Sequence, residues 1–236
     1  SQAIAYSISD TAAKIVANVG GLNEAINITA TDNCTFAQAK VIEDATNSGS
    51  ITYNISDTAT NIAAGIGSDN AVISSAGTIT ATTNATVAEL ETIGGDNKAI
   101  TFSVEDTASN LAGATAARIL KAVNVTATTD ATVAQAVAID TNTNAGAGGY
   151  NTYNIKDTAA NIAEKSNTFL TKAVTVTVDG TANISQAETL SALNKAVVYS
   201  VNDSAANALA TAGAAYNEAV NIEITGNLTV AKADVV

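Results

Sequence analysis

The chain has 236 residues, a formal net charge of −12 at pH 7, a single Cys, and no His, Pro, Met or Trp. The lack of His and the single Cys exclude the familiar His- and Cys-based metal centres and nucleophile–base pairs. The acidic surplus argues against nucleic acid or an anionic membrane as a partner, because Lys and Arg must neutralise phosphates in such complexes. No apolar run reaches the roughly 18–20 residues that span a bilayer, and no catalytic motif is found. We therefore expect no membrane insertion in this segment and no enzyme.

Two phrases alternate along the chain, and each occurs five times. The first phrase stands as YSISDTAAKIV (6–16), YNISDTATNIA (53–63), FSVEDTASNLA (102–112), YNIKDTAANIA (153–163) and YSVNDSAANAL (199–209). The second phrase stands as AINITATDNCTFAQAKVI (25–42), GTITATTNATVAELETI (77–93), AVNVTATTDATVAQAVAI (122–139), AVTVTVDGTANISQAETL (173–190) and AVNIEITGNLTVAKADVV (219–236). The Asp residues of the first phrase are 46 to 51 residues apart, a period typical of solenoids, propellers and other repeat arrays.

The first phrase predicts a strand followed by a helix. Tyr53 and Ile55 alternate with polar residues, as in a half-buried strand, and after Asp57 the apolar residues Ala59 and Ile62 follow helical spacing. We expect the Asp to be the N-cap of that helix, because its carboxylate can accept hydrogen bonds from the free amides of the first turn. The expected caps of this kind are Asp10, Asp57, Asp106, Asp157 and Asp203.

The second phrase predicts another strand and another helix. Val123 and Val125 alternate with polar residues, and Thr132 begins a helix with a capping box, in which its side chain caps the N3 amide and Gln135 reaches back. The expected caps of this kind are Thr35, Thr86, Thr132 and Asn183. In the fifth copy Thr229 is followed by Lys232, which departs from the pattern.

The fold class that follows is α/β, a repeat solenoid of about five strand–helix–strand–helix units with parallel strands. The whole chain, 1–236, is expected to be a single array, and the helices, of about 8–12 residues, must be held by neighbouring copies. The alternative is an all-β parallel solenoid in which the Ala-rich segments are loops. Whether both strand types share one sheet or form two stacks stays open. The approximate units are 3–49, 50–97, 98–149, 150–195 and 196–236, the last one truncated.

Two polar columns accompany the first phrase. The Asp column has a second interpretation as a row of calcium ligands, formed by Asp10, Asp57, Asp106, Asp157 and Asp203. The only cofactor considered is therefore calcium. The Asn column, four residues after the Asp, is predicted to bond to backbone groups of the next turn. It consists of Asn61, Asn110, Asn161 and Asn207, with Lys14 in the first copy.

Pairs of Thr two residues apart point to one face of the second-phrase strands. Thr favours strands, so a solvated β-face is the plain interpretation, and the alternative is a binding face for ice or glycans. The pairs are Thr29/Thr31, Thr80/Thr82, Thr126/Thr128 and Thr175/Thr177, with Glu223/Thr225 in the fifth copy. Residues from the first strand type are expected to interrupt this rank, namely Ser7, Asn54, Glu105, Lys156 and Asn202. Cys34 aligns with small apolar residues and is predicted to be a buried filler.

The phrase DTAANIA (157–163), nearly repeated in the other copies, resembles a box in the repeat regions of bacterial surface-layer proteins and giant secreted adhesins. The resemblance covers essentially the whole chain and implies an exported, extracellular, structural protein of a surface layer, filament or adhesin stalk. It transfers no functional residues. Self-association with neighbouring copies of the array, and contacts with cell-surface components, are the partners expected. The alternative function is a binding module that uses the Thr face or the acidic loops for ice, glycan or calcium.

Overall fold

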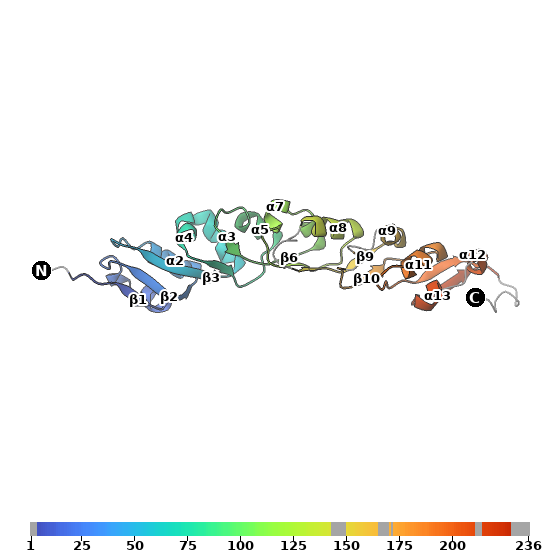
Figure 1. Cartoon of the computed structure of the whole chain (residues 1–236), viewed down its shortest axis with the longest axis horizontal. Coiled ribbons are helices and arrows are strands. Elements are labelled where there is room, and N and C mark those ends of the chain that lie inside the picture. The colour runs from blue at the N-terminus through green and yellow to red at the C-terminus, as the bar shows by residue number, and fades with distance from the viewer. Residues whose placement is uncertain (1–3, 143–149, 165–169, 171, 211–213, 228–236) are drawn as a thin grey trace. The chain divides into compact units, whose positions relative to one another are not determined.

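The computed structural model describes residues 4–142, 150–164, 170, 172–210 and 214–227, and the chain divides into two compact units. Unit 1 comprises residues 1–105, 114–125 and 143–150, and unit 2 comprises residues 106–113, 126–142 and 151–236. Both units are mixed α/β structures with short strands and short helices (Figure 1).

Unit 1 contains the first two copies of each phrase. Its elements are β1 (Ile8–Asp10), α1 (Ala12–Ala17), the 3₁₀ helix η1 (Val19–Gly21), β2 (Ile28–Cys34), α2 (Phe36–Glu43), β3 (Ile51–Asp57), α3 (Ala59–Ser68), α4 (Asn70–Ser75), β4 (Ile79–Ala81), α5 (Val87–Ile93), β5 (Ile100–Thr101) and α7 (Ala116–Ile119). Helix α3 packs against α4 and α5, and α2 packs against α4. In Figure 1, α3, α4 and α5 lie on the same side of β3.

Unit 2 repeats the alternation of strand and helix. Its elements are α6 (Ala108–Ala112), α8 (Val133–Asn142), β8 (Asn151–Thr152), β9 (Ile155–Asp157), α9 (Ala159–Ala163), β10 (Val176–Val178), α11 (Ile184–Ser191), β11 (Val201–Ser204), α12 (Ala205–Ala210), α13 (Ala214–Glu218) and β12 (Ile222–Thr225). Strands β6 (Val104–Asp106) and β7 (Val125–Ala127) include residues of both units. The all-β alternative is wrong, because the Ala-rich segments that follow each Asp are helices.

The strands run parallel to their neighbours, and strand order follows chain order. The longest sheet has the order β1-β2-β3-β4-β5, and the other sheets are β6-β7-β8, β9-β10 and β11-β12. First-phrase and second-phrase strands alternate within these sheets, which answers the question that the sequence left open. In unit 1 the register places Ile8 opposite Ile28, Ile55 opposite Ile79, and Ile79 opposite Ile100.

The sequence missed a short helix between the first-phrase helix and the second-phrase strand. This additional element is present as η1, α4, α7 and α13 in the described part of the chain. In α4 the residues Val72 and Ile73 are fully buried, so packing holds a helix that is too short to be stable by itself. The first-phrase helices are also shorter than expected in several copies, since α6 and α9 have only five residues each.

The core is built mainly from Ala, Ile, Val and Leu side chains, with a few aromatic rings. Tyr53 and Ile55 of β3 are each 1% exposed, and Ile62 of α3 is completely buried. Gly65 of α3 permits a close approach, because a Cβ there would lie 2.2 Å from the ring of Phe36 in α2. This packing fixes the position of each strand end relative to the helices. The recurring polar residues lie at these strand ends.

Candidate functional site

The carboxylate of Asp57 joins two phrases at the carboxyl end of β3. Its Oδ1 accepts hydrogen bonds from the amide of Thr58 at 2.7 Å and from Nδ2 of Asn61 at 2.8 Å. Its Oδ2 accepts from the amide of Phe36 at 2.8 Å. Phe36 is the first residue of α2, which belongs to the preceding second phrase. We call this arrangement, at each first-phrase Asp, the Asp junction.

The Asp junction recurs along the chain. The bond to the amide of the next residue is present at Asp10, Asp106, Asp157 and Asp203, at 2.6–2.8 Å. The bond from the Asn side chain is present at Asn110, Asn161 and Asn207, and Lys14 forms an ion pair with Asp10 instead. The bond to the preceding helix is made by the amides of Val133 and Ile184, to Asp157 and Asp203 respectively.

The prediction that these Asp residues cap their own helices is wrong. The N-cap of α3 is Thr58, whose hydroxyl accepts from the amide of Asn61 at 3.2 Å. Asp57 still belongs to the strand ladder, opposite Ala81, so the helix begins one residue later than expected. The same correction applies to Asp10, Asp106, Asp157 and Asp203, which are followed by Thr11, Thr107, Thr158 and Ser204. Only Thr11 makes no side-chain cap bond.

The prediction for the Asn column is also wrong. Asn61, Asn110, Asn161 and Asn207 do not bond to the backbone of the next turn, because each donates to the Asp of its own phrase. The spacing of four residues places the amide one helical turn from the strand end, directly beside the carboxylate. The Asn therefore orients the Asp and leaves the other carboxylate oxygen for the neighbouring phrase.

A second set of bonds runs in the opposite direction between phrases. The first amide of α3, at Ala59, donates to the Thr83 hydroxyl at 3.0 Å, and the first amide of α6, at Ala108, donates to Thr129 at 3.0 Å. In the first copy the amide of Ala12 donates to Asp32 at 2.7 Å. Helix N-termini leave several amides without intrahelical partners. Residues of the adjoining strand segments satisfy one of these amides in each of these helices.

The second-phrase caps lie where the sequence places them. Thr35, Thr86 and Asn183 are the N-caps of α2, α5 and α11, and each forms a complete capping box with the residue three positions later. Thr132 makes the same two bonds with Gln135, at 2.9 and 3.2 Å. Thr229 lies outside the described residues.

A different set of Asn residues connects neighbouring strands. Oδ1 of Asn27 accepts from the amide of Ser50 at 3.0 Å, and Oδ1 of Asn54 accepts from the amide of Thr78 at 2.8 Å. Gly77 belongs to this contact, because a Cβ there would lie only 2.6 Å from Oδ1 of Asn54. The signal in the sequence is an Asn directly before a β-branched strand residue, as in YNI and VNV, and it recurs in both phrases.

The Thr face is more regular than expected in the first sheet. Thr29 lies in register with Ser9 and Thr52, and Thr80 lies in register with Ser56 and Thr101. Neither Ser7 nor Asn54 is the register partner of these Thr residues. In unit 2 the rank is interrupted, since Lys156 lies opposite Thr177. The remaining pair members are Thr31, Thr82, Thr126, Thr128 and Thr175, all exposed or half-buried.

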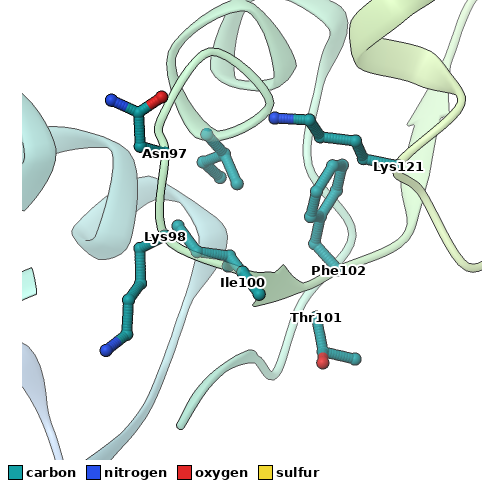
Figure 2. Close-up of a pocket in the computed structure, with 8 residues that line it drawn as sticks. Asn97, Lys98, Ile100, Thr101, Phe102 and Lys121 are labelled. Atoms are coloured by element: carbon teal, nitrogen blue, oxygen red, sulfur yellow. The ribbon is translucent and has the colours of Figure 1, made fainter. Parts of the chain in front are cut away.

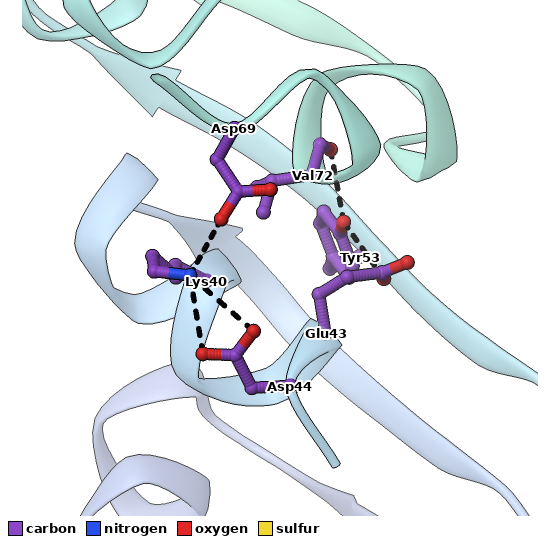
Figure 3. Close-up of polar contacts among 6 residues, drawn as sticks. All are labelled: Lys40, Glu43, Asp44, Tyr53, Asp69 and Val72. Atoms are coloured by element: carbon purple, nitrogen blue, oxygen red, sulfur yellow. Dashed lines mark hydrogen bonds and ion pairs between the residues drawn. The ribbon is translucent and has the colours of Figure 1, made fainter. Parts of the chain in front are cut away.

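Figure 3 shows a polar cluster that joins β3 to α2 and α4. The Tyr53 hydroxyl lies 2.9 Å from the Val72 carbonyl oxygen and 3.0 Å from Oε2 of Glu43. Burial, followed by the interaction with Glu43, raises the pKa of Tyr53 above its ordinary value. Nearby, Lys40 of α2 pairs with Asp69 in the connection between α3 and α4. Both contacts join α2 to the segment between the next first phrase and second phrase, which contains Asp69 and α4.

A cavity of about 430 Å³ lies beside β5 in unit 1 (Figure 2). Phe102 and Ile93 give it apolar walls, and Lys121 extends past the Phe102 ring while Lys98 points away. Nζ of Lys121 is 3.2 Å from the carbonyl oxygen of Asp96, so the ammonium group is held by the backbone. The residues that line this cavity contain no acid–base pair.

The electrostatics of the Asp junction follow from its hydrogen bonds. Desolvation raises the pKa of Asp57, but the bonds from Asn61, Phe36 and Thr58 outweigh it, so the net pKa lies below the usual value. The amides of Ile184 and Ser204 likewise lower the pKa of Asp203. In the described part of the chain, no three His, Cys, Asp or Glu residues lie close enough together to hold a metal ion.

Cys34 is free and completely buried, and burial raises its pKa to about 11. The thiol is therefore protonated at neutral pH and is shielded from reagents. Within the described residues, no helix is both long and apolar enough to traverse a bilayer. Comparison of the chain with protein-family models, with curated proteins and with solved structures finds no match.

Proposed function

We propose that the chain is a structural, non-enzymatic segment of an extracellular cell-surface protein, folded as a repetitive α/β solenoid. It would serve in a surface layer, a filament or an adhesin stalk, with neighbouring copies of the same array and cell-surface components as partners. No cofactor is part of the proposal.

The observation that carries this proposal is the Asp junction. In a solenoid each repeat contacts only its neighbours, and stability comes from the interfaces between them. The contact between Asp57 and the first amide of α2 is an interface of that kind. It recurs at Asp157 and Asp203 with equivalent partners. Parallel strands whose order follows the chain also support a solenoid.

The chemistry of the recurring residues supports a scaffold rather than a catalyst. Both oxygens of Asp57 accept hydrogen bonds from the protein, at 2.7–2.8 Å. A general base or a calcium ligand needs an oxygen that is open to its proton or cation. The recurring carboxylates at Asp57, Asp157 and Asp203 are instead engaged in holding helix amides.

Deletion of one whole unit tests the proposal. Removal of residues 50–97 brings Asp106 within one residue of the position of Asp57 after α2, so the junction with Phe36 can form again. We expect the shortened chain to keep its circular dichroism per residue and to melt cooperatively, at a moderately lower temperature.

The matched control removes residues 50–73, half as many. This deletion leaves two second phrases in succession and deprives the Phe36 amide of its carboxylate. The smaller deletion should therefore be more disruptive than the larger one. If removal of 50–97 lowers the melting temperature or the circular dichroism per residue as much as removal of 50–73 does, or more, the solenoid proposal is contradicted.

A second candidate function is binding through the hydroxyl face. The observation in its favour is the in-register rank of Ser9, Thr29 and Thr52, with a second rank at Ser56, Thr80 and Thr101. Adjacent parallel strands are roughly 4.8 Å apart, so the hydroxyl groups are evenly spaced. Ice or a glycan would be the ligand.

Thermal hysteresis and glycan-array binding test this candidate. Thr80→Lys should abolish either activity, whereas Thr115→Lys, outside the face, should leave it intact. Absence of both activities in the unmodified chain would exclude the candidate.

A further inference from the structure

The cavity beside β5 has an equivalent further along the chain. Residues 93–102, which lead from the end of α5 to the next first-phrase strand, align with residues 190–199, and both segments contain the sequence Asn-Lys-Ala. A second cavity, of about 530 Å³, lies in unit 2 at the aligned position, where it is lined by Leu190, Asn194, Lys195 and Glu218. The same space is therefore present at two connections between a second-phrase helix and the following strand.

Two other connections of this kind place a carboxylate beside the residue that aligns with Lys121. At the end of α2, Glu43 accepts a hydrogen bond from Oγ of the aligned Ser75 at 2.7 Å, in addition to the contact with the Tyr53 hydroxyl in Figure 3. In α8, Asp140 forms an ion pair with the aligned Lys172 at 2.8 Å. The repeat therefore has a position for a carboxylate next to this residue.

The connection beside β5 lacks that carboxylate. Gly94 aligns with Glu43, and a Cβ at Gly94 would lie 2.9 Å from Cβ of Arg118, so the packing leaves no room for a side chain there. Among the described residues Lys121 forms no ion pair, and its Nζ donates to the Asp96 carbonyl oxygen at 3.2 Å. Because an ammonium group has three donors, Lys121 can also bind an anion that enters the cavity.

The other walls of this cavity suit an apolar group. Ile93 and Phe102, which line it, are only 1% and 2% exposed. In Figure 2, Lys121 extends past the Phe102 ring, whereas Lys98 points away, and Nζ of Lys98 donates to the Ser74 carbonyl oxygen at 3.2 Å. The cavity volume of about 430 Å³ lies within the usual range for small-molecule sites, which combine apolar walls with a few polar groups.

We propose that the cavity beside β5 binds a small monocarboxylate with an aromatic or branched apolar body. Nζ of Lys121 donates to the carboxylate, as Nζ of Lys172 does to Asp140, and the apolar body packs against Phe102. The aligned cavity in unit 2 has Glu218 in place of Lys121 and therefore repels the same ligand. The site goes beyond the proposed scaffold function and does not depend on it.

A nuclear magnetic resonance titration of the intact, isotope-labelled chain with phenylacetate tests the site. We expect saturable shifts of the backbone amides of residues 97–102 and of Lys121, with a Kd on the order of 1 mM for a ligand of this size. Phenylacetamide has the same shape without the charge, and acetate has the charge without the ring. Each should bind at least about fivefold more weakly, because each lacks one of the two interactions.

The aligned cavity in unit 2 is a control within the same chain. Because Glu218 replaces Lys121 there, the backbone amides of residues 194–197 should not respond to phenylacetate. The proposal would be overturned by the lack of a saturable shift at residues 97–102, by equal shifts at the two cavities, or by equal affinity for phenylacetate and phenylacetamide.

Two variants with the same change of charge identify the cation. Lys121→Met should weaken phenylacetate binding at least about fivefold, whereas Lys98→Met should leave it unchanged, because the Lys98 side chain points away from the cavity. Far-UV circular dichroism checks that both variants are folded. Equal affinity in Lys121→Met and the unmodified chain would also overturn the proposal. The unit-deletion experiment is independent of these results, since it measures folding within one chain.

Discussion

Asp57 shows how one side chain can replace several backbone partners. Among the described residues it is the one buried charged side chain, with 9% exposure. A buried carboxylate is costly unless hydrogen bonds satisfy it, and here two amides and one side-chain amide do so. The carboxylate satisfies helix amides that the α-helical ladder leaves open.

Asp57→Asn should lower the free energy of unfolding by about 2–3 kcal/mol, because the new NH₂ group cannot accept from the amides that face it. Urea denaturation measures the change. Asp44→Asn is the control, since Asp44 is exposed and pairs with Lys40, and its effect should stay within about 0.5 kcal/mol. An equal loss in both variants would contradict the role of the Asp junction.

Gly77 is required by a close approach rather than by its backbone angle. Gly77→Ala should destabilise the protein by about 1–3 kcal/mol, because its Cβ would lie 2.6 Å from Oδ1 of Asn54. Gly67→Ala in α3 has nothing within 4 Å of the added Cβ. It should stabilise the helix by up to about 1 kcal/mol. Thermal melts of the two variants should therefore shift in opposite directions.

At the scale of elements, helix starts are set by two kinds of cap. Local capping boxes, such as Thr86 with Glu89, lie within one segment of sequence. Caps from another phrase, such as Thr83 on the first amide of α3, depend on tertiary packing. The short helices need both kinds, because helices of this length are marginal in isolation.

Thr83→Val should cost about 1 kcal/mol, since it removes the hydroxyl that accepts from the Ala59 amide while keeping the side-chain shape. Hydrogen exchange of the Ala59 amide should accelerate in this variant. Thr82→Val is the control at the neighbouring exposed position. If exchange at Ala59 is equally fast in both variants, the Thr83 bond does not protect α3.

At the scale of the whole molecule, the carboxylates make stability depend on pH. The pKa values of Asp10, Asp57 and Asp203 are lowered by their hydrogen bonds in the folded state. As the pH falls below about 4, the unfolded chain therefore binds protons before the folded chain does. The stability that these carboxylates contribute is lost as the pH falls from there through their lowered folded-state pKa values.

The melting temperature should accordingly be level from about pH 5 to pH 8 and fall steeply below about pH 4. The pKa of Tyr53 is raised by burial, so its contribution to stability is lost instead as the pH rises above about 10. Thermal melts across this range measure both limits. In Asp57→Asn the acid limb should be shallower, and an unchanged limb would contradict the assignment.

Some features of the fold could be predicted because they are local in the chain. The change of hydrophobic period at Asp57 predicts a strand followed by a helix, and the Thr86–Glu89 spacing predicts a capping box. The short helix α4 was missed, because packing of Val72 and Ile73 holds it rather than a distinct start signal.

The sequence by itself determined the alternation of strand and helix, the second-phrase caps and the burial of Cys34, since all three follow from periodicity and neighbouring residues. Only the tertiary structure decided that Asp57 reaches back to Phe36 and that Asn54, rather than Asn61, contacts the next strand. The physical reason is register. Pairing with a strand more than twenty residues away keeps Asp57 in β3, so that α3 begins one residue later. A shift of one residue at this point changes which side chain faces which amide.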